Sequence, residues 1–442
     1  MKFKTMHYKT NQGFYCFYLL CVFSVLLLLS CASASFAVSK PAAIPEDFFG
    51  ITPSRSPLDR EDFDLLDYFN AAWIRDTPRW SYVEQEEGKW NFEYWDYYVE
   101  KAEAAGKKTV FVLGFDNPWL YSNKKEHRDL TEREIPFFLK YVEQVVSRYQ
   151  NRVVYEIWNE PNWLFWKGSS RHFYALSAAT VKKIREIEPT AVIIVGSTMR
   201  VSKRFTKGMH KAGALENVDG FSLHPYAASP KNTISQIDKQ RTILDKLNFD
   251  KPIWVTEVGY STGPASFCSI KQYPEYIIKT LCGMAVRAGN VKNFIWFEYQ
   301  NDYNKGEEPN RLNPTYHFGL IYPNREFKPG AEAFSLTAQN LAGSEYRPEL
   351  PLREGIKSEI TALFFKGNNG KNTLILWKDG GEKQKLFLAV SGTAEVFCHD
   401  ILSGEAVPLN AETVLYIGRD PVFVTWTGEG IPSLRKVPIS RR

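Results

Sequence analysis

The strongest constraint on the fold is a regular alternation of apolar, strand-like runs with helix-like segments between residues 48 and 341. The strand-like runs are short, mostly continuous in apolar residues, and rich in β-branched and aromatic side chains. They are expected at 48–51, 72–75, 109–114, 153–158, 191–196, 220–226, 252–257 and 293–298. Helices, marked by helical periodicity and capping signals, are expected at 62–69, 94–105, 131–149, 173–187, 205–212, 234–247, 276–288 and 329–341.

Continuous apolar runs indicate strands buried on both faces, as in a parallel sheet covered by helices. Eight such strands alternating with eight helices over about 300 residues fit a (β/α)8 TIM barrel. We place this α/β barrel at residues 45–343. A doubly wound open sheet is the competing architecture, but no glycine-rich phosphate loop follows an early strand.

The pattern changes after about Gly343. Short strand-like runs separated by Gly-Asn and Gly-Gly turns replace the alternation, which predicts a small all-β sandwich at residues 344–428. No catalytic constellation is visible in it, so packing or carbohydrate binding is the only role it suggests. Residues 429–442 are basic and are expected to form a solvated tail.

The first 36 residues have the composition of a signal peptide or lipoprotein signal. A basic start is followed by an apolar run from Phe14 to Leu29 and then by small residues around Cys31. Two outcomes stay open: lipid attachment at Cys31, which would tie the protein to a membrane, or simple cleavage near Ala32-Ser33-Ala34. Either predicts an exported protein that is periplasmic, secreted or lipid-anchored at the cell envelope. No second apolar stretch is long enough to span a membrane.

Charge argues against a nucleic-acid partner. The net charge of +5 falls to about +2 without the three lysines of the export signal, and the other basic residues are mixed with acidic ones. A nucleic-acid binder would instead carry a basic face or stripe.

Beyond the export signal the cysteines are Cys268, Cys282 and Cys398. An odd number without close spacing fits neither a disulfide framework nor a zinc site. Cys268 and Cys282 could pair or could remain buried thiols. No metal and no cofactor are expected.

Polar residues gather at the exits of the expected barrel strands, the face where barrel active sites lie. They are Arg75, Asp116, Asn117, Asn159, Glu160, His224, Tyr226, Glu257 and Glu298. Glu160 and Glu257 follow the fourth and seventh strands, which lie nearly opposite each other across a barrel. Glycoside cleavage needs such a pair, because one carboxyl protonates the leaving oxygen while the other attacks or activates water. For either residue alone, an ordinary structural carboxylate is the alternative.

Aromatic residues are abundant, with 12 Trp and 23 Tyr. Excess aromatics can fill a core, but their faces also pack on the apolar faces of pyranose rings. Four aromatic residues lie in expected loops: Trp119, Trp163, Trp166 and Tyr299. For these, stacking on a sugar and packing within the protein are equally open.

Two motifs carry a family resemblance. Trp158-Asn159-Glu160-Pro161-Asn162 resembles the acid/base motif of glycoside hydrolase clan A, and Trp254-Val255-Thr256-Glu257-Val258-Gly259 resembles the nucleophile strand of that clan. Further segments are similar to glycoside hydrolase family 39: Arg75-Asp76-Thr77-Pro78-Arg79-Trp80, Glu84, Gly88, His224-Pro225-Tyr226, Trp296 and Phe318-Gly319-Leu320. The resemblance covers residues 48–341 and implies a glycosidase that hydrolyses O-glycosyl compounds (EC 3.2.1.-).

The resemblance implies Glu160 as the general acid/base and Glu257 as the nucleophile of a retaining double displacement. Asn159 would bind the 2-hydroxyl of the sugar. Arg75 would favour the ionised form of Glu257. The implied substrate is a β-linked oligo- or polysaccharide.

The remaining implied residues have stated alternatives. His224 and Tyr226 would orient the nucleophile and the sugar, or would simply close a tight turn before Pro225. Trp296 would form the floor of the sugar subsite, or would fill the barrel. Glu298 is given no role.

Two rival functions remain. One is a noncatalytic carbohydrate-binding surface protein on a decayed barrel, which the presence of both carboxylates disfavours. The other is a transglycosylase acting on exported polysaccharide, which would use the same residues with a sugar in place of water.

Overall fold

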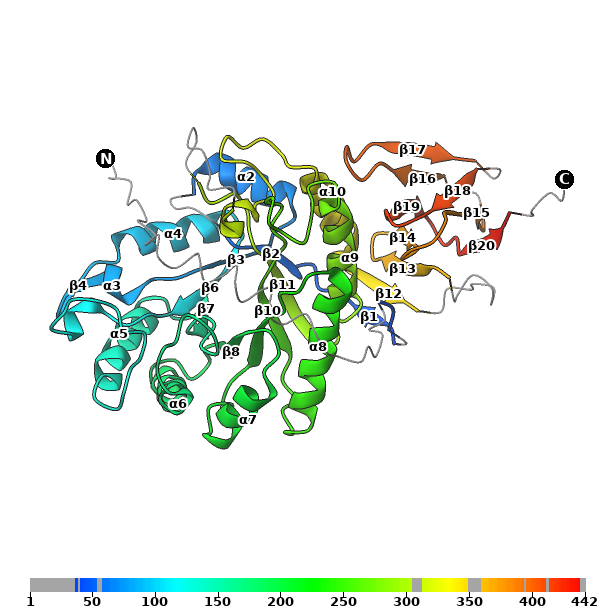
Figure 1. Cartoon of the computed structure of the whole chain (residues 1–442). Coiled ribbons are helices and arrows are strands. Elements are labelled where there is room, and N and C mark those ends of the chain that lie inside the picture. Colours follow the sequence, from blue (N-terminus) through cyan, green and yellow to red (C-terminus); the bar gives the residue numbers. More distant parts are fainter. Residues whose placement is uncertain are drawn as a thin grey trace.

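The protein is described by a computed structural model that covers residues 36–38, 40–53, 58–303, 312–348, 359–392, 395–410 and 413–437 (Figure 1). Residues 1–35 of the expected export signal, including Cys31, lie outside these residues, and only its last residue, Phe36, is described. Within them, none of the helices combines the length and apolarity that crossing a bilayer requires.

Eight parallel strands form a closed barrel, which confirms the expected (β/α)8 architecture. The barrel closes where β11 pairs with β2, with Phe294 opposite Phe49. In order around the barrel, the strands are β2 (Phe49–Ile51), β3 (Trp73–Asp76), β6 (Lys108–Leu113), β7 (Val153–Ile157), β8 (Ile193–Met199), β9 (Gly220–His224), β10 (Ile253–Val258) and β11 (Val291–Trp296).

Helices cover the outside of the barrel, as Figure 1 shows. Each expected helix is present, with ends shifted by a few residues: α2 (Arg60–Tyr68), α4 (Glu93–Ala104), α5 (Ile135–Arg148), α6 (Ser170–Ile187), α7 (Lys203–Lys211), α8 (Pro230–Asp245), α9 (Tyr273–Ala285) and α10 (Gly330–Leu341). Helix α5 shows why they form, since Phe138, Tyr141, Val142 and Val145 recur at helical spacing and are all buried. The short α3 (Trp80–Val83) and the hairpin of β4 (Glu84–Glu86) and β5 (Lys89–Trp90) were not expected.

The interior of the barrel is divided into an apolar layer and a polar layer. The apolar layer is a buried cluster of Trp73, Val110, Val154, Ile194, Trp254 and Ile295. The rings of Trp73 and Trp254, from strands β3 and β10, contact each other edge to face at 5.5 Å. Because side chains of a strand alternate between faces, the residues two positions later also point into the barrel, one layer nearer its mouth. Arg75, Glu156 and Thr256 are such residues, and they form the polar layer.

The C-terminal part is built of two antiparallel sheets, which confirms the expected β-sandwich fold. One sheet has the order β1-β12-β13-β14-β19-β16-β17, and the other has the order β18-β15-β20. Their buried core includes Leu374, Leu386, Ile417 and Trp426. The strands are β1 (Ala42–Ala43), β12 (Ser344–Arg347), β13 (Thr361–Gly367), β14 (Lys371–Trp377), β15 (Gln384–Val390), β16 (Val396–His399), β17 (Ala406–Leu409), β18 (Val414–Ile417), β19 (Val422–Thr427) and β20 (Pro432–Lys436).

The expectation of a solvated tail over residues 429–442 is wrong for its first half. Strand β20 pairs with β15 and buries Pro432 and Leu434, while Lys436 forms an ion pair with Glu359 at 2.8 Å. The apolar residues alternate with polar ones, which is a strand pattern that the basic composition obscured.

The chain ahead of the barrel is fixed to both parts of the molecule. Strand β1 pairs with β12 at the edge of the larger sheet. The ring of Phe36 packs edge to face on Trp377 of β14 at 5.0 Å, and Arg287, which follows α9, donates to the carbonyl of Phe36 at 3.3 Å. These contacts lie at the end of the barrel where α9 ends and β11 begins.

An ionic network joins two buried residues of the barrel, Lys279 and Glu275, to two exposed residues of the sandwich, Asp379 and Arg419. Lys279 of α9, 3% exposed, donates to Glu275 at 2.9 Å and to Asp379 of the sandwich at 2.7 Å. Arg419 reaches Glu275 from the sandwich side at 2.9 Å. Removing one partner of such a network leaves uncompensated charge in the interface.

We expect Lys279→Met to lower the free energy of unfolding by roughly 3 kcal/mol, because the buried carboxylate of Glu275 loses the cation that lies beside it in the interior, whereas Asp379 is 53% exposed and is solvated by water. Urea denaturation followed by tryptophan fluorescence measures this. Lys182→Met is the matched control, since Lys182 is 81% exposed in its ion pair with Glu186. Equal effects of the two substitutions would contradict the prediction.

Candidate active site

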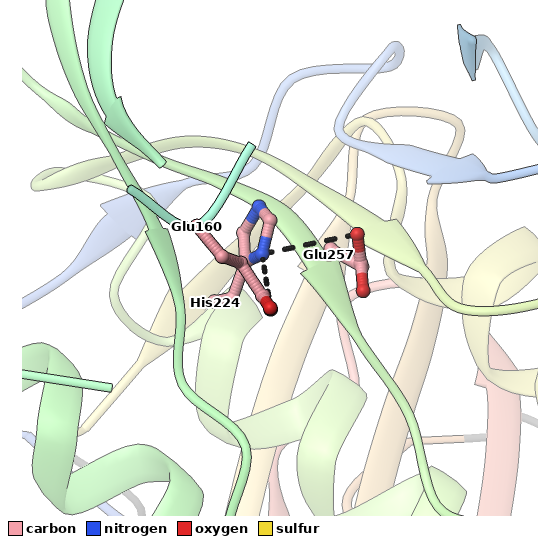
Figure 2. A group of neighbouring side chains, drawn as sticks. All are labelled: Glu160, His224 and Glu257. Carbon is pink, nitrogen blue, oxygen red and sulfur yellow. Dashed lines mark hydrogen bonds and ion pairs between the residues drawn. The ribbon is translucent and has the colours of Figure 1, made fainter. Parts of the chain in front are cut away.

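Glu160, His224 and Glu257 converge at the mouth of the barrel, at the carboxyl ends of β7, β9 and β10 (Figure 2). One oxygen of each carboxylate and one imidazole nitrogen lie within 4.8 Å of one another. The expected meeting of two distant carboxylates over one cleft is therefore present in the geometry. The nearest oxygens of the two carboxylates therefore lie within the roughly 5–5.5 Å that separates the carboxyl groups of retaining glycosidases.

Arg75 forms hydrogen bonds with three side chains of the site. Its Nε donates to Glu156 at 2.6 Å, its Nη1 to Glu257 at 2.9 Å and its Nη2 to Asn159 at 2.7 Å. The guanidinium thus joins β3, β7 and β10, and its side chain is only 6% exposed. A guanidinium presents several donors in one plane, which suits this three-way contact better than an ammonium would.

Glu257 is held in the geometry of an ionised carboxylate. Besides the ion pair with Arg75, it accepts a hydrogen bond from the hydroxyl of Tyr226 at 2.8 Å. Burial raises the pKa of Glu257 above its ordinary value, and Arg75 and the Tyr226 hydrogen bond reduce this increase. Of the two candidate catalytic carboxyls, it has the contacts that favour the charged form.

Glu160 is held in an environment that favours its protonated form. Burial raises the pKa of Glu160 well above its ordinary value, and the charge of Glu257 raises it further, whereas Arg75 opposes the shift. Its Oε1 lies 3.0 Å from Nδ1 of His224, and its backbone N–H donates to the carbonyl of Ser197 at 2.9 Å. Two neighbouring carboxyls with opposite preferences are the arrangement that acid–base chemistry requires.

Sequence reasoning missed Glu156, which lies in the middle of strand β7. It is fully buried, accepts from Arg75, and also accepts from Thr256 Oγ1 at 2.7 Å. A signal existed, because Arg75, Glu156 and Thr256 each follow a residue of the apolar layer by two positions. A charge in an otherwise apolar strand, on the face that points into the barrel, indicates a buried polar partner.

Trp296 does not form a subsite floor, which corrects the expectation for this residue. Its ring is fully buried and packs against Tyr260, Tyr273 and Phe334, between the barrel and its helices. The reason is the alternation of the strand: Ile295 faces the interior, so Trp296 faces outward.

Phe297 takes the position at the mouth that was expected for Trp296. It is half-buried, and its ring packs against Phe318 at 5.4 Å. Phe318 in turn lies 6.0 Å from the ring of Tyr226, whose hydroxyl contacts Glu257. This row of rings forms an apolar wall beside the carboxylate.

The other strand-exit candidates support loops. Asp116 accepts from the backbone N–H of Arg128 at 2.9 Å, and Asn117 donates to the carbonyl of Glu84 at 2.7 Å. Glu298 is buried near Lys328, whose pKa is lowered to about 7 by burial despite the charge of Glu298.

The loop aromatics differ in exposure. Trp163 is 38% exposed, Trp119 is half-buried, and Trp166 and Tyr299 are buried. The cysteines at positions 268, 282 and 398 are free thiols, so the expected alternative of a Cys268–Cys282 bond is wrong.

Glu160, His224 and Glu257 are also the kind of donor set that can hold a metal ion. The contacts fit a hydrogen-bonded site better. His224 lies at hydrogen-bond distance from Glu160, and the guanidinium of Arg75 already supplies the positive charge beside Glu257.

The closed barrel and its paired carboxylates define the class of barrel glycosidases. Residues 70–302 match a family model described as Cellulase (glycosyl hydrolase family 5), a stretch that covers more than half of the 442-residue chain. The chain belongs to this family, which is part of clan A, and it is a glycosidase acting on O-glycosyl compounds. No curated protein matches the chain.

Solved structures show the same fold. A family 39 glycoside hydrolase from Bacteroides cellulosilyticus WH2 has a TM-score of 0.72 at 22% identity, covering 87% of this chain and 81% of that chain. A monomeric beta-xylosidase from Caulobacter crescentus CB15 has a TM-score of 0.63 at 14% identity, covering 88% of this chain and 97% of that one. The family match confirms the expected resemblance to clan A. The likeness to these structures, of which the first is from family 39, is at these identities a likeness of fold alone.

We expect Phe297→Ala to lower kcat/KM by about tenfold, because an aromatic ring beside the carboxylate is lost from the wall that would face the sugar. Trp296→Phe should lower the melting temperature and leave kcat/KM within about twofold, since its ring packs outside the barrel. Steady-state kinetics with an aryl glycoside and thermal denaturation separate the two effects. A tenfold loss in Trp296→Phe and none in Phe297→Ala would reverse the assignment.

Proposed function

We propose that this glycosidase is a retaining enzyme that cleaves a β-linked oligo- or polysaccharide by double displacement. Glu160 is the general acid/base and Glu257 is the nucleophile. The observation that carries the proposal is the close approach of two carboxyls, one favoured as the acid and the other as the anion. This pairing of environments is the general pattern of two-carboxylate glycosidases.

In the first step, a Glu257 oxygen attacks the anomeric carbon while Glu160 transfers its proton to the leaving oxygen. The bond between carbon and that oxygen breaks, and its electron pair leaves with the departing group. The product is a glycosyl ester on Glu257. Esterification removes the negative charge that favours the protonated form of Glu160, so the pKa of Glu160 falls.

In the second step, Glu160 acts as a base toward water. It takes a proton from the water molecule, whose oxygen attacks the anomeric carbon and displaces Glu257. Both displacements invert that carbon, so the overall configuration is retained. The enzyme returns to its starting state with a proton on Glu160 and a charge on Glu257.

Three neighbours of the carboxylates have supporting roles. Arg75 and Tyr226 hold the two oxygens of Glu257 in place, each through a direct hydrogen bond to one of them. Asn159 accepts from Arg75 through its Oδ1, so its amide N–H₂ is oriented for the 2-hydroxyl of the sugar.

The substrate proposal is a β-linked pyranoside, and β-xylosides are the first class to test because the Caulobacter crescentus neighbour is a beta-xylosidase. Glycans that contain uronic acids and secreted exopolysaccharides belong in the same panel. A transglycosylase would differ only in the acceptor, so product analysis at high sugar concentration separates transfer from hydrolysis. Binding without any turnover of aryl glycosides would favour the noncatalytic alternative.

We expect Glu257→Ala and Glu160→Ala each to lower kcat by about 10³-fold or more, since each removes one of the two groups that the chemistry requires. Azide should partly restore Glu160→Ala on a 2,4-dinitrophenyl glycoside, whose leaving group needs no proton. Glu188→Gln is the matched control, because Glu188 is a buried carboxylate at the closed end of the barrel. Near-normal turnover by Glu257→Ala, or an inverted first product in a proton NMR time course, would refute the mechanism.

We further propose that the enzyme acts outside the cytoplasm, after export directed by its first 36 residues, either anchored through Cys31 or released. Mass spectrometry of the mature protein from membrane and soluble fractions should find a chain that lacks the apolar run 14–29, with a lipid mass if Cys31 is modified. A mature chain that starts at Met1 would exclude both versions.

A further inference from the structure

His224 lies between the two carboxyls and makes contacts with both ring nitrogens. Nδ1 is 3.0 Å from Glu160 Oε1. Nε2 is 3.1 Å from Thr256 Oγ1, 3.3 Å from Ser197 Oγ and 3.5 Å from Arg75 Nη2. Burial holds the pKa of His224 well below its ordinary value, and the charge of Arg75 lowers it further. The ring is therefore neutral and carries one proton on one of its two nitrogens.

The nearest partner of Nε2 shows which nitrogen carries that proton. Thr256 Oγ1 is 2.7 Å from Glu156 Oε1, a carboxylate whose other oxygen is bound by Arg75 at 2.6 Å. A hydroxyl has a single proton, and the short contact to an ion-paired carboxylate is the stronger use for it. The oxygen of Thr256 is then left as an acceptor, so it takes a hydrogen bond from Nε2–H.

If Nε2 carries the proton, Nδ1 has only a lone pair. The contact with Glu160 at 3.0 Å can then be a hydrogen bond only if Glu160 is the donor. The charged groups around Glu160 fit this assignment. The negative charges of Glu257 and Glu156 oppose a further negative charge on Glu160. Arg75 forms its hydrogen bonds with Glu257 and Glu156 rather than with Glu160.

We propose that Glu156 and Thr256 are positioning residues that fix His224 as the Nε2–H tautomer. Nδ1 of His224 then accepts a hydrogen bond from the carboxyl O–H of Glu160, which keeps Glu160 protonated. This inference rests on the proposed role of Glu160. In the first step, the leaving oxygen replaces Nδ1 as the acceptor of that proton. The resulting carboxylate faces a lone pair with no donor, which makes it a better base toward water in the second step.

The opposite tautomer would have the opposite effect. Ser197 or Arg75 would donate to Nε2, and Nδ1–H would donate to Glu160. A hydrogen bond to the charged form stabilises it, so Glu160 would lose its proton more easily. The two arrangements place the same heavy atoms at the same distances and differ only in where the protons of His224 and Glu160 lie, which makes them separable by experiment.

The direct test is the ¹⁵N NMR spectrum of the whole protein with labelled histidine rings, without substrate. The chain has seven histidines, and His224→Gln assigns the signal in question. The expected spectrum at neutral pH has a protonated Nε2 and an unprotonated Nδ1. A protonated Nδ1 would overturn the proposal, whatever substrate the enzyme is found to use. The catalytic role proposed for Glu160 is tested separately, by the kinetics of Glu160→Ala.

The second test uses Thr256→Val and Thr256→Ser with the aryl glycoside that the wild-type protein hydrolyses fastest. In Thr256→Val, Nε2 loses its nearest acceptor and Ser197 becomes free to donate to it, so the tautomer should change and the alkaline limb of kcat/KM should move down by about one pH unit. Thr256→Ser keeps the hydroxyl and should keep the wild-type limb and ¹⁵N signature. The matched control is Thr280→Val, a buried threonine whose hydroxyl contacts Tyr260 outside the barrel. If the alkaline limb of Thr256→Val matches that of Thr280→Val, the proposed role of Thr256 is contradicted. If Thr256→Val does not fold, the ¹⁵N spectrum of the wild-type protein still shows which tautomer His224 adopts.

Discussion

The site depends on a guanidinium that is buried in the interior of the barrel. Taking such a charge out of water costs several kcal/mol unless partners of opposite charge and hydrogen-bond acceptors surround it. Arg75 meets this requirement with Glu156, Glu257 and Asn159, which come from two other strands and the loop after β7. One cation thereby fixes Glu156, Glu257 and Asn159 relative to one another. The rest of the barrel has to be rigid enough to keep these partners in place.

The apolar layer beneath Arg75 supplies that rigidity. Trp73 and Trp254 contact each other across the barrel interior directly below the polar residues. The same strands continue from apolar to polar side chains within two positions, so the charged groups lie on a packed support and open only toward the mouth. The side chains of Glu160 and Glu257 are 4% and 13% exposed, which keeps both in a setting of low polarity where charge interactions are strong.

The fold could be predicted because continuous apolar runs and helical periodicity are local signals, and each expected barrel strand and helix is present. The two carboxylates could be proposed because each ends a recognisable strand. Glu156 was missed although its charge in an otherwise apolar strand was a local signal, because that signal does not say which residue it contacts, and Thr256 lies 100 positions away in the sequence. Trp296 was misplaced because the argument used the end of the strand without its alternation, and one position decides which face of the barrel a side chain meets. The tail over residues 429–442 was misread because its charge outweighed a short alternating pattern.

The way the chain enters the barrel also has a consequence for which end of the barrel an N-terminal attachment would leave open. Phe36 is pinned against Trp377 and Arg287 at the closed end, while the carboxylates open at the other end. An attachment through the chain ahead of Phe36 would lie at the closed end of the barrel. The end that carries the two carboxylates would then face away from it. A long glycan could then reach the carboxylates without first passing whatever holds the protein.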